Sequence, residues 1–249
     1  MDPIAFEIGP ISVRWYGILI ALSFLIGLYG ITTQAKKAQM NSDDIFSTLL
    51  WVIPAAIIGA RLYYVIFGWD YYSSHPSEII AVWHGGLAVH GGLLAGIGTI
   101  ILCSRYYKFS ALALLDLAAP FMILGQAIGR WGNFFNQEAY GYEVSKEDWP
   151  LAMYIDGAYR HPTFLYESIW NLIGFFILFY YQKKQPPKGQ VAFLYLMYYS
   201  LGRFFIEGFR TDSLMIGGLR TAQLISLLLF VIGFVLWQYT KKRHQSSKN

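Results

Sequence analysis

The strongest constraint on the fold of this chain is its series of apolar runs. Several of them approach or exceed the roughly 20 residues that a helix needs to cross the hydrocarbon core of a membrane. Of the 249 residues, 55% are hydrophobic and only 14% are charged. We therefore predict an all-α polytopic membrane protein with about seven transmembrane helices. These helices are expected at residues 12–34, 45–67, 83–104, 110–135, 162–182, 190–208 and 219–240.

Basic residues between the predicted helices indicate the orientation. They fall in alternate connections, and positive charge marks the cytoplasmic side of a membrane protein. The residues are Lys36, Lys37, Arg105, Lys108, Lys183, Lys184, Lys188, Lys241, Lys242 and Arg243. The amino terminus is then predicted outside and the carboxyl terminus in the cytoplasm. We expect one integral membrane domain over residues 1–240, a small extracytoplasmic cap at about 136–161, and a basic, disordered cytoplasmic tail at 241–249.

The charge balance does not point to a nucleic-acid partner. The formal net charge is +4, but the location of the basic residues is explained by membrane orientation. The only cysteine, Cys103, excludes an intrachain disulfide and a multi-cysteine metal site.

Most of the basic residues outside the predicted cytoplasmic connections are arginines. Once the tail residue Lys248 is also set aside, eight of the nineteen basic residues remain, and seven of these are arginine. Five belong to predicted helices or their outer ends: Arg14, Arg61, Arg130, Arg203 and Arg210. An arginine near the bilayer centre costs about 2.5–3.5 kcal/mol, so it implies a partner, a water-filled cavity or an anionic ligand. Interfacial snorkelling also explains Arg14 and Arg220.

The segment Gly129–Glu138, with sequence GRWGNFFNQE, follows an apolar run. If the helix continues through it, Arg130, Asn133 and Gln137 share one face. The glycines of this segment are equally typical of close helix packing around a snorkelling arginine. The pattern alone leaves both interpretations open.

The sequence His-Gly-Gly-Leu occurs twice, beginning at His84 and at His90. On a continuous helix the two imidazoles point about 120° apart, which disfavours a shared metal ion. Histidine is the natural general base near neutral pH, so His90 is a candidate base. A structural histidine that bonds a backbone carbonyl is the alternative for both positions.

Charged residues form a stripe near the end of the sixth predicted helix. Arg203, Glu207 and Arg210 lie at i, i+4 and i+7, and two arginines around one glutamate give a net positive site for phosphate. A self-contained set of ion pairs that locks helices together is the alternative. Glu167 falls inside the fifth predicted helix, where we expect an arginine partner, with an anchoring or a catalytic role.

The predicted orientation places several polar residues at the same membrane level. They come early in inward-running helices or late in outward-running ones: Tyr16, Arg61, His90, Arg130, His161 and Arg210. Together they predict a cationic cavity beneath the outer surface, although Tyr16 is also typical of an interfacial aromatic belt.

These motifs resemble those of the prolipoprotein diacylglyceryl transferase family. The resemblance rests on Trp15-Tyr16-Gly17, His90–Leu93, Gly129–Glu138, His161–Glu167 and Gly202–Arg210, and so covers nearly the whole chain. It implies seven membrane crossings. The resemblance also implies a set of essential residues: Tyr16, His90, Arg130, Asn133, Glu138, Gly141 and Arg210, with Glu207 and Glu167 added less directly.

The resemblance implies transfer of the diacylglyceryl group of phosphatidylglycerol to the lipobox cysteine of a prolipoprotein signal peptide. A thioether forms and glycerol phosphate leaves, as the first step of bacterial lipoprotein maturation. The implied location is the bacterial cytoplasmic membrane, with the active site on the extracytoplasmic side. Arg130 and Arg210 are expected at the phosphate, Asn133, Glu138, Gly141 and Glu207 at the lipid headgroup, and Tyr16 as a hydrogen-bond donor. Either His90 or Arg210 activates the thiol, and no metal or cofactor is expected.

A phospholipid transporter or flippase is the main alternative, since it also needs an outer cationic cavity. A retinal photoreceptor is disfavoured because residues 219–240 contain no lysine for a Schiff base. A membrane metalloprotease is disfavoured because the chain lacks His-Glu-x-x-His.

Overall fold

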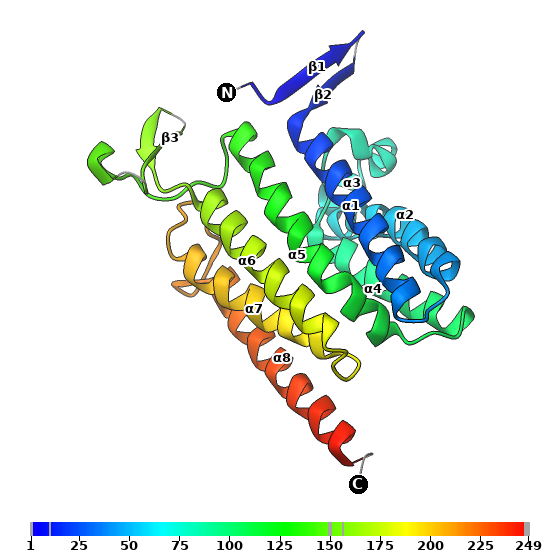
Figure 1. Ribbon diagram of the computed structural model, residues 1–249. Coiled ribbons are helices and arrows are strands. Elements are labelled where there is room, and N and C mark those ends of the chain that lie inside the picture. The colour runs from blue at the N-terminus through cyan, green and yellow to red at the C-terminus, as the bar shows by residue number, and fades with distance from the viewer. Residues whose placement is uncertain (1, 10, 149–150, 156, 247–249) are drawn as a thin grey trace. The chain divides into compact units, whose positions relative to one another are not determined.

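The computed structural model describes residues 2–9, 11–148, 151–155 and 157–246 (Figure 1). Within these ranges, seven long helices each overlap one of the predicted ranges. They are α1 (Trp15–Lys37), α2 (Ser42–Phe67), α4 (Val89–Tyr106), α5 (Ala111–Asn136), α6 (Thr163–Lys183), α7 (Gln190–Glu207) and α8 (Thr221–Ser246). The prediction of a mostly helical membrane protein is confirmed.

Five of these helices, among the described residues, are long and apolar enough to cross a membrane: α1, α2, α5, α6 and α8. Helices α4 and α7 have 18 residues each and are not in this group. Seven crossings and the orientation of the termini therefore stay predictions.

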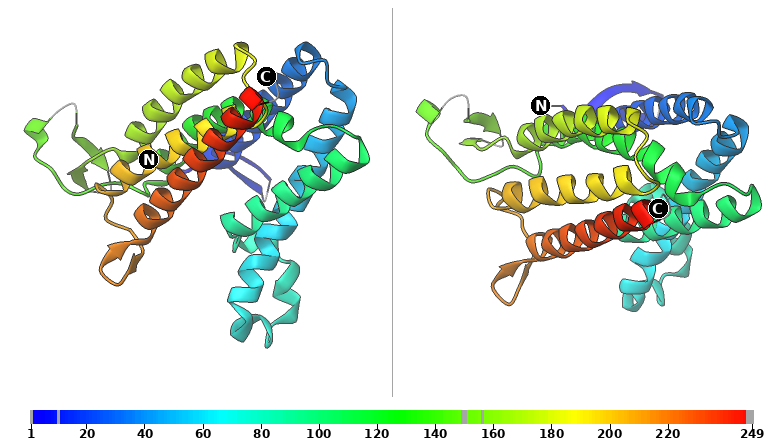
Figure 2. Two further views of the ribbon diagram at one scale, coloured as in Figure 1. Left: turned by 90° about the horizontal axis from the view of Figure 1, so that it is seen from below. Right: turned by 60° about the horizontal axis from the view of Figure 1, so that its bottom comes forward.

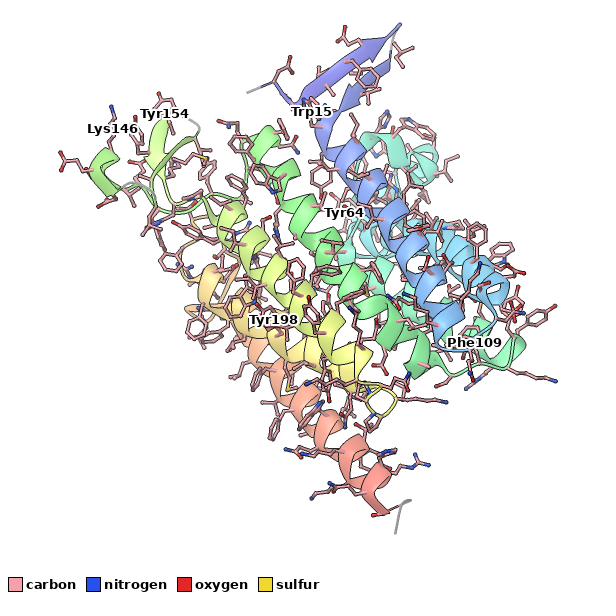
Figure 3. All side chains as sticks on the ribbon, in the orientation of Figure 1. Trp15, Tyr64, Phe109, Lys146, Tyr154 and Tyr198 are labelled. Carbon is pink, nitrogen blue, oxygen red and sulfur yellow. The ribbon has the colours of Figure 1, made fainter. Side chains whose placement is uncertain are left out.

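Short elements occupy the connections. In the described part of the chain, three antiparallel strand pairs are formed by β1 (Ile4–Ile8) with β2 (Ile11–Arg14), β3 (Met153–Ile155) with β4 (Ala158–Arg160), and β5 (Met215–Ile216) with β6 (Leu219–Arg220). Single turns of helix make up α3 (Trp69–Tyr72), η1 (Pro76–Ile80), η2 (Val82–His84) and η3 (Lys146–Asp148). The predicted cap contains η3, β3 and β4, and Figure 3 labels its residues Lys146 and Tyr154.

The chain divides into two compact units. The first comprises residues 1–31 and 115–249, and the second comprises residues 32–114. In the second unit, α2 packs against α4 at two glycines. A Cβ atom added to Gly91 would lie 2.2 Å from the carbonyl oxygen of Gly59, so only small residues allow this approach.

In the first unit, α7 packs against both α6 and α8, and Figure 2 shows α7 and α8 running side by side. Tyr198 of α7, labelled in Figure 3, stacks on Trp170 of α6 with ring centroids 4.7 Å apart. Its hydroxyl donates to the carbonyl of Trp170 at 2.9 Å, and the indole donates back to the carbonyl of Tyr198 at 3.2 Å. Gly202 provides the space for the indole. The glycine that opens the Gly202–Arg210 motif therefore sets the α6–α7 distance.

A carboxylate fixes the other end of α7. The first backbone N–H groups of any helix lack partners within the helix. Asp116 of α5 accepts from the N–H of Gly189 at 2.6 Å and from that of Ala192 at 2.9 Å. Asp116 thus joins α5 to the start of α7.

Two predicted boundaries are wrong. The third helix starts at Val89 rather than at residue 83, because Gly85 and Gly86 take positive φ values of 87° and 72° and break the helix. The predicted disorder of the tail is wrong for residues 241–246, since α8 continues to Ser246. Basic side chains in the last turn suit the negative end of the helix dipole. Residues 247–249 lie outside the described part of the chain.

Candidate functional site

Glu167 of α6 is the centre of the site in the first unit. One of its carboxylate oxygens pairs with Nε of Arg130 on α5, and the other lies 2.6 Å from Nη1 of Arg203 on α7. The Glu167 side chain is 5% exposed. The predicted arginine partner of Glu167 is confirmed, and a single carboxylate connects three helices.

The contacts continue along α7 and beyond its end. Nη2 of Arg203 lies 2.7 Å from Oε2 of Glu207, without the alignment of a hydrogen bond, and the same oxygen lies 4.0 Å from Nε of Arg210. Arg210 in turn binds both oxygens of Asp212, through Nε at 2.9 Å and Nη2 at 2.7 Å. We call this series the charge ladder. Its members, in order, are Arg130, Glu167, Arg203, Glu207, Arg210 and Asp212.

The ladder corrects the predicted charge of the site. Arg203, Glu207 and Arg210 alone carry a net positive charge, but Glu167 and Asp212 join them from outside the α7 stripe. Three guanidinium groups then face three carboxylates, and the ladder is formally neutral. The predicted net positive charge of Arg203, Glu207 and Arg210 is thus offset by carboxylates from outside α7.

Asp212 is the exposed end of the ladder. Its side chain is 51% exposed, whereas that of Glu207 is 3% exposed. The hydrogen bonds from Arg210 lower the pKa of the Asp212 carboxyl below its usual value. Burial lowers the pKa of Arg210, but its hydrogen bonds and attraction to Asp212 outweigh burial and raise that pKa overall. Both groups are charged at neutral pH.

Asn133 and Glu138 extend the site from Arg130. Nη1 of Arg130 donates to Oδ1 of Asn133 at 3.4 Å, and the Asn133 amide donates to Glu138 at 3.0 Å. The amide of Asn136 donates to the same Glu138 oxygen at 3.1 Å. Gln137 does not share this face as predicted, since α5 ends at Asn136 and Gln137 has a φ of 54°. A residue in this left-handed conformation is a common helix stop.

Gly141 holds the backbone of Arg210 in place. The two residues face each other as an antiparallel β-bridge. A Cβ atom at Gly141 would lie 2.6 Å from Cβ of His161 and 2.8 Å from the carbonyl oxygen of Phe209. Only glycine fits at this position, between His161, where the cap returns to the helices, and Phe209, just after the end of α7. We call this point the root of the cap.

Tyr16 lies at the start of α1 against α5. A Cβ atom at Gly132 would meet the Tyr16 ring at 2.2 Å, so this ring rests on the α5 backbone between Arg130 and Asn133 in the sequence. Trp15, labelled in Figure 3, stacks on Phe135 with ring centroids 5.0 Å apart. The glycine pattern of the 129–138 motif therefore does serve packing, while its polar residues build the site.

His90 belongs to the second unit, at the start of α4. It is exposed, and its ring lies 6.1 Å from that of Tyr63. Among the described residues of that unit, its ring nitrogens have no hydrogen-bond partner, whereas Nδ1 of His84 bonds Glu78 at 2.9 Å. The approach of His90 to the charge ladder stays a prediction.

Arg61 has a structural role within the second unit. Its guanidinium donates to the carbonyls of Ile79 at 3.0 Å, Gly85 at 2.7 Å and Gly86 at 3.0 Å, and also to that of Glu78. The residue is 5% exposed. Arg61 is thus occupied by the segment that leads to α4, rather than being free for a ligand as the predicted cavity required.

His161 lines an apolar cavity of about 400 Å³ in the first unit. Its Nδ1 lies 3.0 Å from the hydroxyl of Tyr166, and its ring packs on Phe209, which directly precedes Arg210. The sequence did not predict this apolar cavity.

Two ladder contacts were missed. Asp212 gave no signal, because an exposed acid after a helix is common. Arg220 was interpreted as interfacial, but it donates to the carbonyl of Glu207 and to the Tyr142 hydroxyl at 2.5 Å. Among the described residues, no group of three His, Cys, Asp or Glu side chains is spaced to hold a metal ion.

The fold and the site define a helical membrane protein in which arginines and carboxylates alternate across three helices. The chain matches the family described as prolipoprotein diacylglyceryl transferase over residues 3–239. It is 47% identical to the phosphatidylglycerol–prolipoprotein diacylglyceryl transferase of Streptococcus mutans, covering 98% of this chain and 97% of that one. The identity is 48% to the protein of the same name from Geobacillus kaustophilus, covering 95% and 92% of the two chains. The chain belongs to the prolipoprotein diacylglyceryl transferase family, and the predicted resemblance is confirmed.

Proposed function

We propose that this chain transfers the diacylglyceryl group of phosphatidylglycerol to the lipobox cysteine of prolipoproteins, on the extracytoplasmic side of a bacterial cytoplasmic membrane. The observation that carries the proposal is the family match over residues 3–239. The charge ladder supports it, because it provides arginines for a phosphate within a helical membrane protein.

In the proposed reaction the nucleophile belongs to the substrate. The thiolate sulfur attacks the glycerol carbon that bears the phosphate, the C–O bond breaks, and its electron pair leaves with the phosphate as glycerol phosphate. A free thiol has a pKa of about 8.5, so a base must take its proton or a cation must stabilise the thiolate. His90 is the proposed base, and its exposed ring is compatible with that role. Arg210 is the rival activator.

Stabilising the leaving phosphate is the main task, since attack at a saturated carbon forms no oxyanion at that carbon. Arg210 is the better placed arginine, because its partner Asp212 is half exposed rather than buried. Arg130 is held by the buried Glu167 and serves more as a fixed positive charge. Removing a charge-assisted contact used in the transition state typically costs about a hundredfold or more in rate.

The remaining residues are proposed to orient the lipid headgroup. Asn133 and Glu138 present an amide and a carboxylate that are already hydrogen-bonded to each other, and Glu138 is exposed. Tyr16 is proposed to donate a hydrogen bond at the same level. Gly141 contributes through its backbone, which positions Arg210.

A purified preparation with phosphatidylglycerol and a lipobox peptide tests the proposal. We expect wild-type enzyme to form the thioether, and Arg130→Ala and His90→Ala to lose a hundredfold or more of the turnover while still inserting in membranes. Matched controls are Arg160→Ala, whose partner Glu143 is 67% exposed, and His84→Ala, whose ring is 60% exposed. Near-normal turnover in His90→Ala would remove it as the base. A transporter would leave phosphatidylglycerol chemically intact, so absence of any thioether product with wild-type enzyme would overturn the transferase proposal.

A further inference from the structure

The charge ladder ends in a carboxylate that none of the proposed chemistry uses. Both carboxylate oxygens of Asp212 accept hydrogen bonds from Arg210, from Nε at 2.9 Å and from Nη2 at 2.7 Å. This two-pronged geometry is the one in which arginine also binds two oxygens of a phosphate. Asp212 thus occupies the donors that a substrate phosphate needs.

The carboxylate of Asp212 and a phosphodiester carry the same charge, so exchanging one for the other leaves the total charge of the ladder unchanged. With Asp212 in place, the ladder has three positive and three negative members. Without it, one positive charge is in excess, which matches the single negative charge of a phosphodiester. A phosphomonoester such as glycerol phosphate carries about −1.5 to −2 at neutral pH, so it leaves an excess of negative charge on the same site.

Asp212 can leave Arg210 without disturbing the rest of the ladder. The backbone of Arg210 is fixed by its β-bridge to Gly141, and Glu207 is buried below it. Asp212 lies two residues further along, in the connection between α7 and β5, with half of its side chain exposed. Rotation of this half-exposed side chain toward solvent would free both Arg210 donors.

We infer that Asp212 is an internal anion that holds Arg210 in the absence of lipid, gives way to the phosphate of phosphatidylglycerol, and returns to Arg210 to displace glycerol phosphate. This inference rests on the proposed function, in which Arg210 binds the phosphate. It makes Asp212 a positioning residue that weakens the binding of both substrate and product. Asp212 does not take part in the bond changes.

The test compares wild type with Asp212→Asn, which keeps the shape and removes the charge, and with Asp212→Ser as a smaller second variant. KM for phosphatidylglycerol and inhibition by added glycerol phosphate are measured with a lipobox peptide in mixed micelles. We expect both variants to lower KM and the glycerol phosphate inhibition constant by at least fivefold, with kcat unchanged or reduced. Asp212→Glu should restore wild-type values. These differences should shrink at high salt, because a half-exposed charge is screened.

Glu143→Gln is the matched control. It removes another exposed carboxylate that pairs with an arginine in the same unit, at 2.8 Å from Arg160, and its constants should equal those of wild type. If KM for phosphatidylglycerol and the glycerol phosphate inhibition constant stay within twofold of wild type in Asp212→Asn and Asp212→Ser, or rise, the inference is overturned. The proposed function still stands in that case, provided that the wild-type enzyme forms the thioether. Failure of wild type to form the thioether overturns the proposed function itself.

Discussion

The two units of the chain hold an arginine of a long helix in opposite ways. In the second unit, Arg61 donates to neutral backbone carbonyls between Glu78 and Gly86, and its guanidinium lies 5.2 Å from the ring centre of Tyr72. In the first unit, Arg203 is placed between two buried carboxylates, Glu167 and Glu207. The first arrangement fixes a loop, because all three guanidinium nitrogens donate to its backbone. The second joins helices through charges, and its outer end can exchange one anion for another. An arginine within an apolar helix therefore indicates a ligand site only when its partners can be replaced.

The largest expected effect comes from removing the loop-fixing arginine. Arg61→Met leaves several carbonyls without a donor, and each buried unsatisfied group costs about 1–3 kcal/mol. We expect residues 76–88 to lose at least tenfold of their hydrogen-exchange protection and transfer to be lost, since this segment leads into His90. Arg105→Met, which changes an exposed residue in the last turn of α4, is the control. If residues 76–88 keep their wild-type exchange protection in Arg61→Met, Arg61 does not fix this loop.

The next effect comes from the centre of the ladder. Glu167→Gln leaves Arg130 and Arg203 without a shared counter-charge, and breaking a buried pair costs about 3–5 kcal/mol. We expect a lower thermal midpoint in detergent and loss of transfer, while the exchange protection of residues 76–88 stays at its wild-type level.

A double variant sharpens this result. Glu167→Gln combined with Arg203→Gln removes one charge of each sign, so we expect it to recover part of the lost thermal stability. A double variant no more stable than Glu167→Gln would show that the ladder acts through shape rather than through charge balance.

A smaller effect is expected from the glycine that positions Arg210. Gly141→Ala places a Cβ atom 2.6 Å from that of His161, so the root of the cap must shift. We expect kcat/KM to fall by about tenfold or more with a change in thermal midpoint of only a few degrees. Gly98→Ala in α4 is the control, because an added Cβ there meets nothing within 4 Å. Equal kcat/KM values for these two glycine variants would argue against the positioning role of Gly141.

The smallest effect is expected at the first His-Gly-Gly-Leu copy. His84→Asn breaks an exposed pair with Glu78, and such pairs contribute about 0–1 kcal/mol. We expect less than a twofold change in turnover, whereas His90→Asn should abolish it. A loss of similar size in both variants would remove the functional distinction between the two copies.

The sequence predicted the features that depend on local pattern. Apolar runs located the helices, and the cost of an unpaired carboxylate predicted an arginine for Glu167, which the structure provides from two other helices. The helix and ion-pair predictions succeed because burial of charge in a membrane permits few arrangements. The roles of Arg130 and Arg210, which the motif resemblance implies, stay predictions.

The errors share a physical cause, which is that the deciding contacts come from distant parts of the chain or from single backbone angles. Asp212 neutralises a site that looks positive when α7 is considered alone. Gln137 leaves the helical face because of one positive φ value. Arg220 lies at the flank of a predicted helix, where an interfacial anchor is expected, yet it donates a hydrogen bond to the carbonyl of Glu207. Spacing along one helix contains none of this information.

The short β-bridge between Gly141 and Arg210 has a consequence for how the cap can vary. Gly141 and Tyr142 hold the cap at its root through hydrogen bonds to His161 at 2.9 Å and 3.1 Å, and Glu143 faces Arg160 one step further out. We expect chain added between Glu143 and Leu151 to leave this root in place, because loop length alters closure entropy slowly. Leu151 itself is tied to α6, since its carbonyl accepts a hydrogen bond from the Tyr166 hydroxyl at 3.2 Å. The cap is thus anchored at two points, its root and Leu151, and an insertion between them is expected to lengthen the cap while the backbone of Arg210 keeps its place.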